Sequence, residues 1–190
     1  MSILVLQPTS TAQWHKLVRE AEASVDYELG EELESYLVFL LIRFAKNPTI
    51  VSNILALEYM HGLLEKGTPR CDKLRDVGDQ CLLFSGLFPN IVERRQVKLT
   101  YFVELGRGAY SELSNALRYS LAEIYAHLAK SFLVLMDVLQ AMRNLDSAKS
   151  VFDPLQSFQI WEETGGRTAL RSLRRYTKAI PISGSKDTAH

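Results

Sequence analysis

Apolar side chains recur every three or four positions along most of this chain. Such spacing places them on one face of an α-helix, whereas a strand would alternate with a period of two, a pattern seen at most over residues 3–6. Prolines and glycines interrupt the apolar pattern where helices would end. The pattern predicts an all-α, single-domain helical bundle of about six to eight helices.

Segment 31–46 is expected to form the central helix of the bundle. Its main apolar stripe is widened by Val38, Phe39 and Ile42, so that the helix is apolar on nearly every side. A helix of this kind is normally enclosed by other helices. Asn47 and Pro48 should end it, because the residue before a proline disfavours the α conformation. The stripe itself consists of Leu33, Tyr36, Leu37, Leu40, Leu41 and Phe44.

Segment 121–145 is expected to form one long amphipathic helix packed along the central one. One of its faces is apolar from Leu121 to Met142. The opposite face carries polar side chains and is expected to meet solvent. These polar residues are Glu123, His127, Lys130, Asp137, Gln140 and Asn144.

The remaining helices are delimited by capping signals. A first helix should begin after Ser10, and Gly106 with Gly108 should break the helical signal between residues 90 and 146. Asp153 and Pro154 should open a helix that ends at Gly165 and Gly166. Two more helices are expected at about residues 48–66 and 70–84.

Composition adds limits to this fold. A chain of 190 residues with 47% hydrophobic content can bury the core of one domain, expected over residues 1–180, with a flexible polar tail over 181–190. The longest apolar run is too short to cross a bilayer, and the N-terminus lacks the pattern of a signal peptide. Cys71 and Cys81 are too far apart on a helix to form a disulfide. These features favour a cytoplasmic protein with reduced thiols.

Charge is distributed unevenly, although the formal net charge is zero. Near the C-terminus, five cations fall on one side of an expected helix, with Leu170, Leu173 and Tyr176 on the other. We name these five residues the basic stripe: Arg167, Arg171, Arg174, Arg175 and Lys178. Near the N-terminus lies an acidic segment without a Lys or Arg, formed by Glu20, Glu22, Asp26, Glu28, Glu31, Glu32 and Glu34.

The basic stripe permits three interpretations. It can pair with the acidic segment, within the monomer or between two copies, and so set how helices dock. It can instead bind an external anionic partner, whether a protein, a nucleic acid or a membrane surface. It can also be a solvated face without a partner.

Few residues suggest catalysis. Glu58 and His61 have the Glu-x-x-His spacing of one half of a carboxylate-bridged di-metal site, and Glu34 could supply a further ligand. Glu123 and His127, the obvious second pair, fall on the polar face of their helix. Gly106-Arg107-Gly108 lacks the lysine, third glycine and preceding strand of a phosphate-binding loop. No nucleophile motif is present, so neither an enzymatic activity nor a cofactor nor a small-molecule substrate is indicated.

The sequence thus favours a non-enzymatic interaction or regulatory protein, oligomeric or bound to a protein partner, that docks through the basic stripe. Two alternatives remain open. One is a nucleic-acid-binding protein that uses the same stripe, and the other is a di-iron-like helical oxidoreductase centred on Glu58 and His61.

Overall fold

The computed structural model of the chain describes residues 9–47, 59, 62–88, 98–145 and 153–176. All regular elements in these ranges are helices, which confirms the all-α prediction. Every helix within them is too short or too polar to cross a bilayer. The helices with described bounds are α1 (Ser10–Val25), α2 (Glu31–Lys46), α4 (Thr68–Leu87), α6 (Leu99–Ala116), α7 (Tyr119–Lys130), α8 (Phe132–Asn144), α9 (Pro154–Thr164) and α10 (Arg167–Tyr176), and residues 59 and 62–64 are helical as well.

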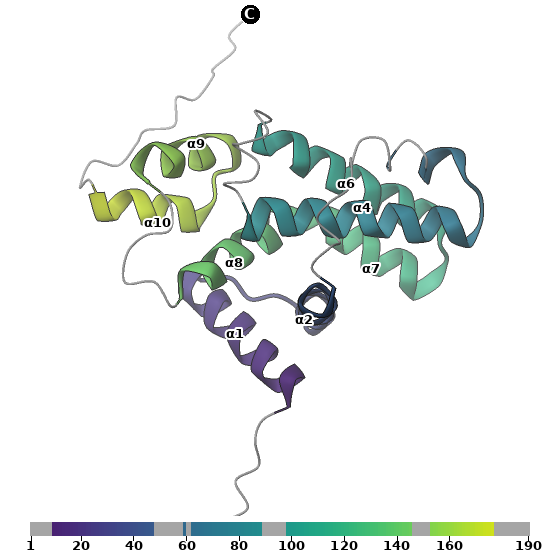
Figure 1. Ribbon diagram of the computed structural model, residues 1–190, viewed down its shortest axis with the longest axis horizontal. Coiled ribbons are helices and arrows are strands. Elements are labelled where there is room, and N and C mark those ends of the chain that lie inside the picture. The colour runs from purple at the N-terminus through teal and green to yellow at the C-terminus, as the bar shows by residue number, and fades with distance from the viewer. Residues whose placement is uncertain (1–8, 48–58, 60–61, 89–97, 146–152, 177–190) are drawn as a thin grey trace, which may run out of the picture.

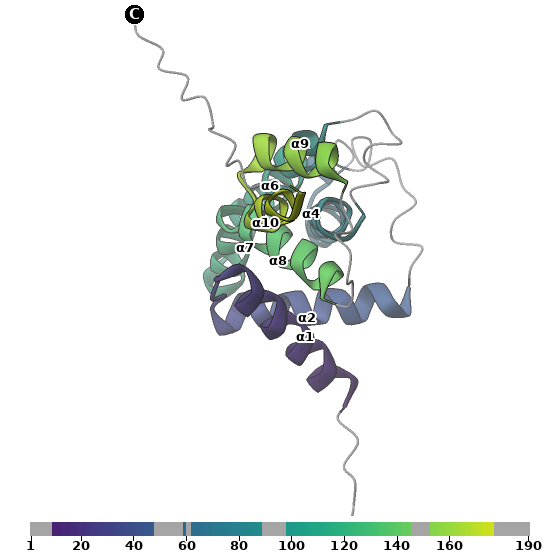
Figure 2. The ribbon, with the colours of Figure 1, turned by 90° about the vertical axis from the view of Figure 1, so that its left-hand side faces the viewer.

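Helix α8 lies between two groups of helices. On one side α4, α6 and α7 run next to one another, and on the other α9 and α10 form a pair (Figure 1). Helices α1 and α2 cover the lower side of the molecule, where α2 is seen along its axis in Figure 1 and crosses the base in Figure 2. Helix α10 contacts α8, and α9 contacts α6 and α10. Helix α1 contacts α8 as well.

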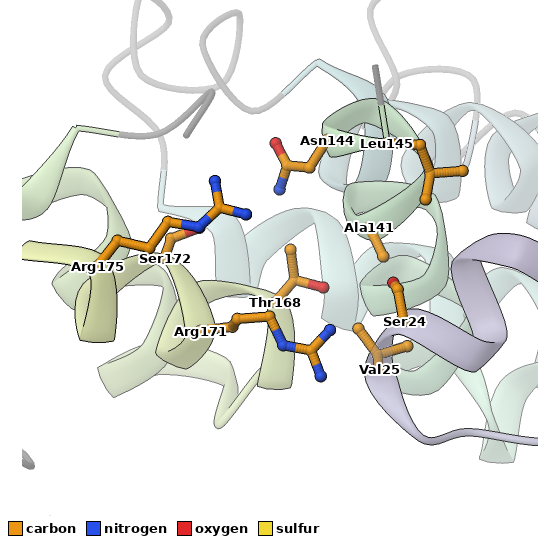
Figure 3. Close-up of a pocket in the computed structure, with 9 residues that line it drawn as sticks. All are labelled: Ser24, Val25, Ala141, Asn144, Leu145, Thr168, Arg171, Ser172 and Arg175. Carbon is orange, nitrogen blue, oxygen red and sulfur yellow. The ribbon is translucent and has the colours of Figure 1, made fainter. Parts of the chain in front are cut away.

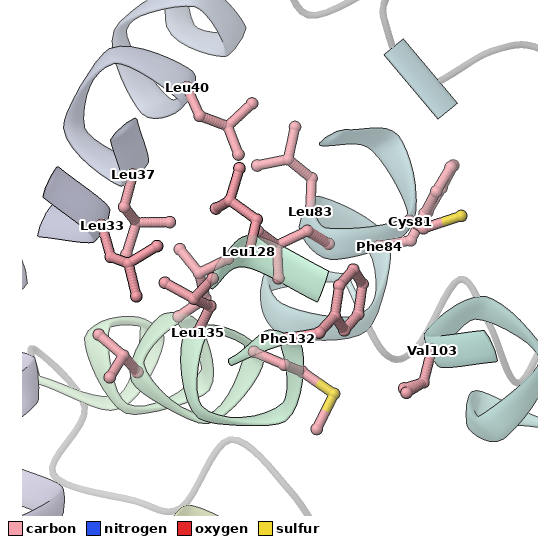
Figure 4. Close-up of a cluster of buried hydrophobic side chains, with 14 of the residues drawn as sticks. Leu33, Leu37, Leu40, Cys81, Leu83, Phe84, Val103, Leu128, Phe132 and Leu135 are labelled. Carbon is pink, nitrogen blue, oxygen red and sulfur yellow. The ribbon is translucent and has the colours of Figure 1, made fainter. Parts of the chain in front are cut away.

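The central helix is α8 and not α2. Helix α8 contacts α1, α4, α6, α7 and α10, whereas α2 packs mainly on α1 and α7. Leu33, Leu37 and Leu40 of α2 point into the core (Figure 4), but Phe39 on its other side is 63% exposed. The sequence prediction was wrong here because an apolar residue on the far face of a helix does not by itself require a neighbour to cover it.

The predicted long helix over residues 121–145 is two helices that meet at Ser131. The backbone of Ser131 has φ −94° and ψ 10°, outside the regular helical region. The bend lets α7 pack on α6 while α8 packs on α1 and α4. The prediction of a polar solvent face also failed for Asp137 and Gln140, which are buried in α8.

Glycines allow α4, α6 and α8 to approach closely. A Cβ atom on Gly106 would lie 2.6 Å from the Phe132 ring and 2.7 Å from Cys81 Cβ, and one on Gly86 would lie 2.5 Å from Leu139 Cβ. The prediction that Gly106 interrupts the helix was therefore wrong. Helix α6 continues through it to Ala116, because this glycine makes room for another helix and forms no turn.

Several predicted ends agree with the structure to within a few residues. Helix α9 begins with the Asp153 side chain accepting from Gln156 N at 2.8 Å, and it ends at Gly165 with φ 67°. Helix α1 is capped by Thr9, one residue before the predicted Ser10. Cys71 and Cys81 are both free, as expected. Most of the expected helix at 48–66, the tail at 181–190 and Lys178 lie outside the described residues.

Candidate functional site

The basic helix α10 begins on a buried carboxylate from α8. Asp137 is 1% exposed, and its two side-chain oxygens accept from Arg167 N at 2.8 Å and Thr168 N at 2.9 Å. The Thr168 hydroxyl donates to the Asp137 carbonyl oxygen at 3.0 Å. Because the first N–H groups of a helix lack partners within the helix, a carboxylate there satisfies them and opposes the positive end of the helix dipole. Asp137 therefore fixes where α10 starts.

Arg167 ties the same end of α10 to the C-terminus of α1. Its Nη1 donates to the carbonyl oxygens of Val25 at 3.0 Å and Asp26 at 2.6 Å. Its guanidinium carbon lies 4.1 Å from the centre of the Tyr27 ring. A cation is favourable at the C-terminal, negative end of a helix dipole. It is also favourable over the face of an aromatic ring. Arg167, predicted to bind a partner, is thus engaged within the fold.

Arg171 is the one residue of the described basic stripe that pairs with a side chain of the acidic segment. Its Nη2 lies 3.7 Å from Asp26 Oδ2, and the two side chains are 47% and 83% exposed. An ion pair this exposed contributes about 0–1 kcal/mol to stability. Arg174 and Arg175 are also exposed, and neither has an ion-pair partner among the described residues. Pairing within the monomer therefore accounts for only part of the described stripe.

Most other acids of the segment contact groups outside the stripe. Glu22 is buried and its carboxylate accepts from Leu29 N, while Glu32 lies 3.2 Å from His127 Nδ1. Burial raises the pKa of Glu22 above its ordinary value. Glu28 and Glu31 are exposed. The acidic segment and Arg174 therefore remain separate charged surfaces in the monomer.

Glu34 is held by two basic side chains of α1. Its Oε1 accepts from Arg19 Nε at 2.8 Å and shares a hydrogen bond with His15 Nδ1 at 2.9 Å. Burial raises the pKa of Glu34, but these hydrogen bonds outweigh burial and leave the pKa below its ordinary value. The other predicted metal ligands, Glu58 and His61, lie outside the described residues. Among the described residues, no three His, Cys, Asp or Glu side chains cluster as metal ligands would.

A second buried carboxylate joins α2, α4 and α6. Asp79 Oδ1 accepts from the hydroxyls of Tyr36 and Tyr110, both at 2.6 Å, and Asp79 Oδ2 accepts from Arg43. Burial raises the pKa of Asp79 even though these partners oppose the rise. Tyr110 is fully buried, so no substrate can reach this cluster from its side. We interpret it as a structural network, which the sequence did not reveal because its members are far apart in the chain.

A cavity of about 240 Å³ lies where α10 meets the ends of α1 and α8. Arg171 and Arg175 enter it from α10; Arg175 extends toward Asn144, and Arg171 toward Ser24 and Val25 (Figure 3). The described lining contains no carboxylate. It consists of Ser24, Val25, Ala141, Asn144, Leu145, Thr168, Arg171, Ser172 and Arg175.

The basic stripe is therefore divided by the fold into residues with different environments. Arg167 is engaged with α1, Arg171 and Arg175 line the cavity, and Arg174 faces solvent away from it. Guanidinium groups so placed can bind carboxylates or phosphates by paired hydrogen bonds. Comparison of the chain with models of protein families, with curated proteins and with solved structures gave no match to any of them.

Proposed function

We propose that this chain is a non-enzymatic interaction protein that docks an acidic protein surface through the exposed arginines of α10. The observation that carries the proposal is the exposure of Arg174 and Arg175 on a helix whose start is fixed by Asp137. No ion pair within the described residues occupies these two arginines. Arginines held on a fixed helix suit recognition of carboxylates, because less freedom is lost when the hydrogen bonds form.

A second copy of the chain offers a surface of the required charge. Glu28 and Glu31 are exposed, and neither forms an ion pair within the described residues. Because the net charge of the chain is zero, two copies do not repel each other through their overall charge. Local complementarity then sets which surfaces meet.

Charge reversal at Arg174 and Arg175 tests the proposal. The control reverses Arg118 and Lys130, exposed cations at the two ends of α7, and thus makes the same change in net charge. Sedimentation velocity over a range of concentrations measures self-association, and cross-linking in cell extract followed by mass spectrometry identifies other partners. We expect R174E/R175E to lose association that R118E/K130E retains. Equal association by both variants would refute docking through α10.

Mixing two variants then identifies the partner. If a second copy is bound through its acidic segment, R174E/R175E should associate with an E28K/E31K variant, because the reversed charges attract again. Without such rescue, the surface docked by α10 belongs to a different protein.

Binding of a nucleic acid by the same arginines would show a different salt dependence. With three phosphates neutralised, log K should fall with log salt at a slope of about −2.7, or roughly 40-fold between 50 and 200 mM salt. Fluorescence anisotropy with labelled single- and double-stranded DNA and RNA measures this slope. If a nucleic acid binds with this slope and R174E/R175E no longer binds it, the partner of α10 is a nucleic acid and not a protein.

A further inference from the structure

The cavity between α1, α8 and α10 has the composition of an anion site. Two guanidinium groups enter it, and no carboxylate is found among its described lining residues. The nearest acid contact of these arginines is Asp26, whose exposed side chain lies 3.7 Å from Arg171 Nη2. Such a pair is weak and can be displaced by a better acceptor.

The start of α10 is not the anion site. Its first N–H groups already donate to Asp137. An incoming anion must therefore bind the side chains on the next turns of α10, where Arg171, Ser172 and Arg175 face the cavity. Asp137 itself does not line the cavity, although Thr168, whose N–H it accepts from, does.

One polar group in the cavity lacks a partner within the described part of the chain. Asn144 Oδ1 is removed from solvent and forms no hydrogen bond. Ser172 is 4% exposed and lines the same cavity. In contrast, the Ser24 and Thr168 hydroxyls donate to backbone carbonyls at 2.7 and 3.0 Å. Because a buried polar group without a partner is unfavourable, the Asn144 side chain is expected to gain a partner when a ligand binds.

The size and charge of the cavity favour a phosphoryl group over larger or singly charged ligands. Its volume of about 240 Å³ falls below the roughly 300–1,000 Å³ of pockets for drug-sized molecules. A phosphomonoester carries a charge of about −1.5 to −2 and three acceptor oxygens, which match two guanidinium groups better than a carboxylate does. Val25, Ala141 and Leu145 provide an apolar wall for the carbon part of such a ligand.

We propose that this cavity binds the phosphoryl group of a small phosphomonoester. Arg171 and Arg175 pair with its oxygens, and Ser172 and the Asn144 amide hydrogen-bond to it. The amide of Asn144 can present either its oxygen or its NH₂ group by rotation of the side-chain end. The site shares Arg175 with the proposed docking surface, whereas Arg174 belongs to the docking surface alone, because it does not line the cavity.

Titration of the full chain with inorganic phosphate and with phenyl phosphate tests the site. Chemical shifts of the backbone amides are followed at constant ionic strength, with benzoate as the carboxylate of matched size. We expect saturable binding of both phosphates, with shifts centred on residues 144, 171, 172 and 175, and weaker binding of benzoate. Arg175→Ala should weaken phosphate binding by roughly 10- to 100-fold, as for loss of charged hydrogen bonds. The phosphate affinity of Arg175→Lys should lie between that of the parent chain and that of Arg175→Ala, because lysine keeps the charge but cannot form the paired hydrogen bonds of a guanidinium group.

The matched control is Arg174→Ala, which removes the same charge one residue away from the cavity. It should leave phosphate affinity unchanged, while Ser172→Ala should weaken it. Absence of saturable binding, equal losses in Arg174→Ala and Arg175→Ala, or tighter binding of benzoate would each overturn the proposal. An unchanged melting temperature in Arg175→Ala shows that a loss of binding reflects the site and not the fold. Saturable phosphate binding by the parent chain, together with equal association of R174E/R175E and R118E/K130E, would refute the proposed function alone.

Discussion

Replacing Asp137 with asparagine is the sharpest test of how the fold holds its basic helix. The two side chains have nearly the same shape, so packing around residue 137 should be preserved. The carboxylate accepts from Arg167 N and Thr168 N with separate oxygens. The asparagine keeps one oxygen, and its NH₂ group must then face the other N–H, where it cannot accept.

Asp137→Asn is expected to lower the free energy of unfolding by about 2–3 kcal/mol. A hydrogen bond to a charged group contributes about 1.5–3 kcal/mol, and the favourable interaction of a carboxylate with a helix start, up to about 2 kcal/mol, overlaps with it. For a chain of this length, each kcal/mol shifts the melting temperature by about 2–4 °C. Asp137→Asn should therefore melt roughly 4–12 °C below the parent protein.

Asp153→Asn is the matched control. Asp153 caps α9 by accepting only from Gln156 N, at 2.8 Å, and asparagine caps helices about as well as aspartate. Urea denaturation followed by circular dichroism, together with hydrogen exchange of the α10 amides, measures both variants. We expect large losses of stability and of α10 protection for Asp137→Asn and small changes for Asp153→Asn. Equal losses of stability and of α10 protection in the two variants would refute the role assigned to Asp137.

Two further predictions concern the packing of α4, α6 and α8 and the buried carboxylate of α4. Gly106→Ala should destabilise the protein by about 1–3 kcal/mol in urea denaturation, because its Cβ would lie 2.6 Å from the Phe132 ring. Gly108→Ala should change stability by less, because its Cβ would come no closer than 3.3 Å to the described residues, at the Tyr59 hydroxyl; a loss equal to that of Gly106→Ala would contradict the packing argument. Tyr110→Phe removes a hydroxyl that donates to Asp79 at 2.6 Å and lowers the Asp79 pKa. Because burial raises the pKa of Asp79 in the folded state, folding favours its protonated form, and stability from this group falls as pH rises from the unfolded pKa through the folded one. The variant raises the folded pKa further, so its stability loss relative to the parent should grow as the pH rises and reach about 1.5–3 kcal/mol once Asp79 is ionised. A loss that stays constant over the whole pH range in which Asp79 ionises would show that Tyr110 does not stabilise the ionised carboxylate.

Local chemistry made some helix ends predictable. Asp153, Pro154 and Gly165 each act on backbone within a few residues, so their effect can be read from the sequence alone. The side of α10 that carries its cations was predictable for the same reason, since helical periodicity is local. Leu173 is buried while Arg171 and Arg174 are exposed, as that periodicity requires, but Tyr176, expected on the same side as Leu173, is 52% exposed.

Long-range packing decided the features that the sequence did not predict. Glycine is common in turns, but Gly106 is needed for close packing against Phe132, which lies on another helix. Asp137 falls on a polar stripe, yet it is buried because the start of α10 provides it with two N–H donors from thirty residues away. A pattern of polar positions shows that a side chain needs hydrogen-bond partners. It does not show whether water or another helix supplies them.

The same reasoning explains why the basic stripe cannot act as an isolated helix. Helix α10 has ten residues, and helices shorter than about 12–15 residues are marginal in water without tertiary contacts. Asp137 and Arg167 supply those contacts at its first turn, and Ala169, Ser172 and Leu173 bury its inner side. Arg174 and Arg175 therefore project from a backbone whose ordering is provided by the fold and not by a partner. A partner of the kind we propose would need to order only these two side chains, so docking through them would depend on the anchoring of α10.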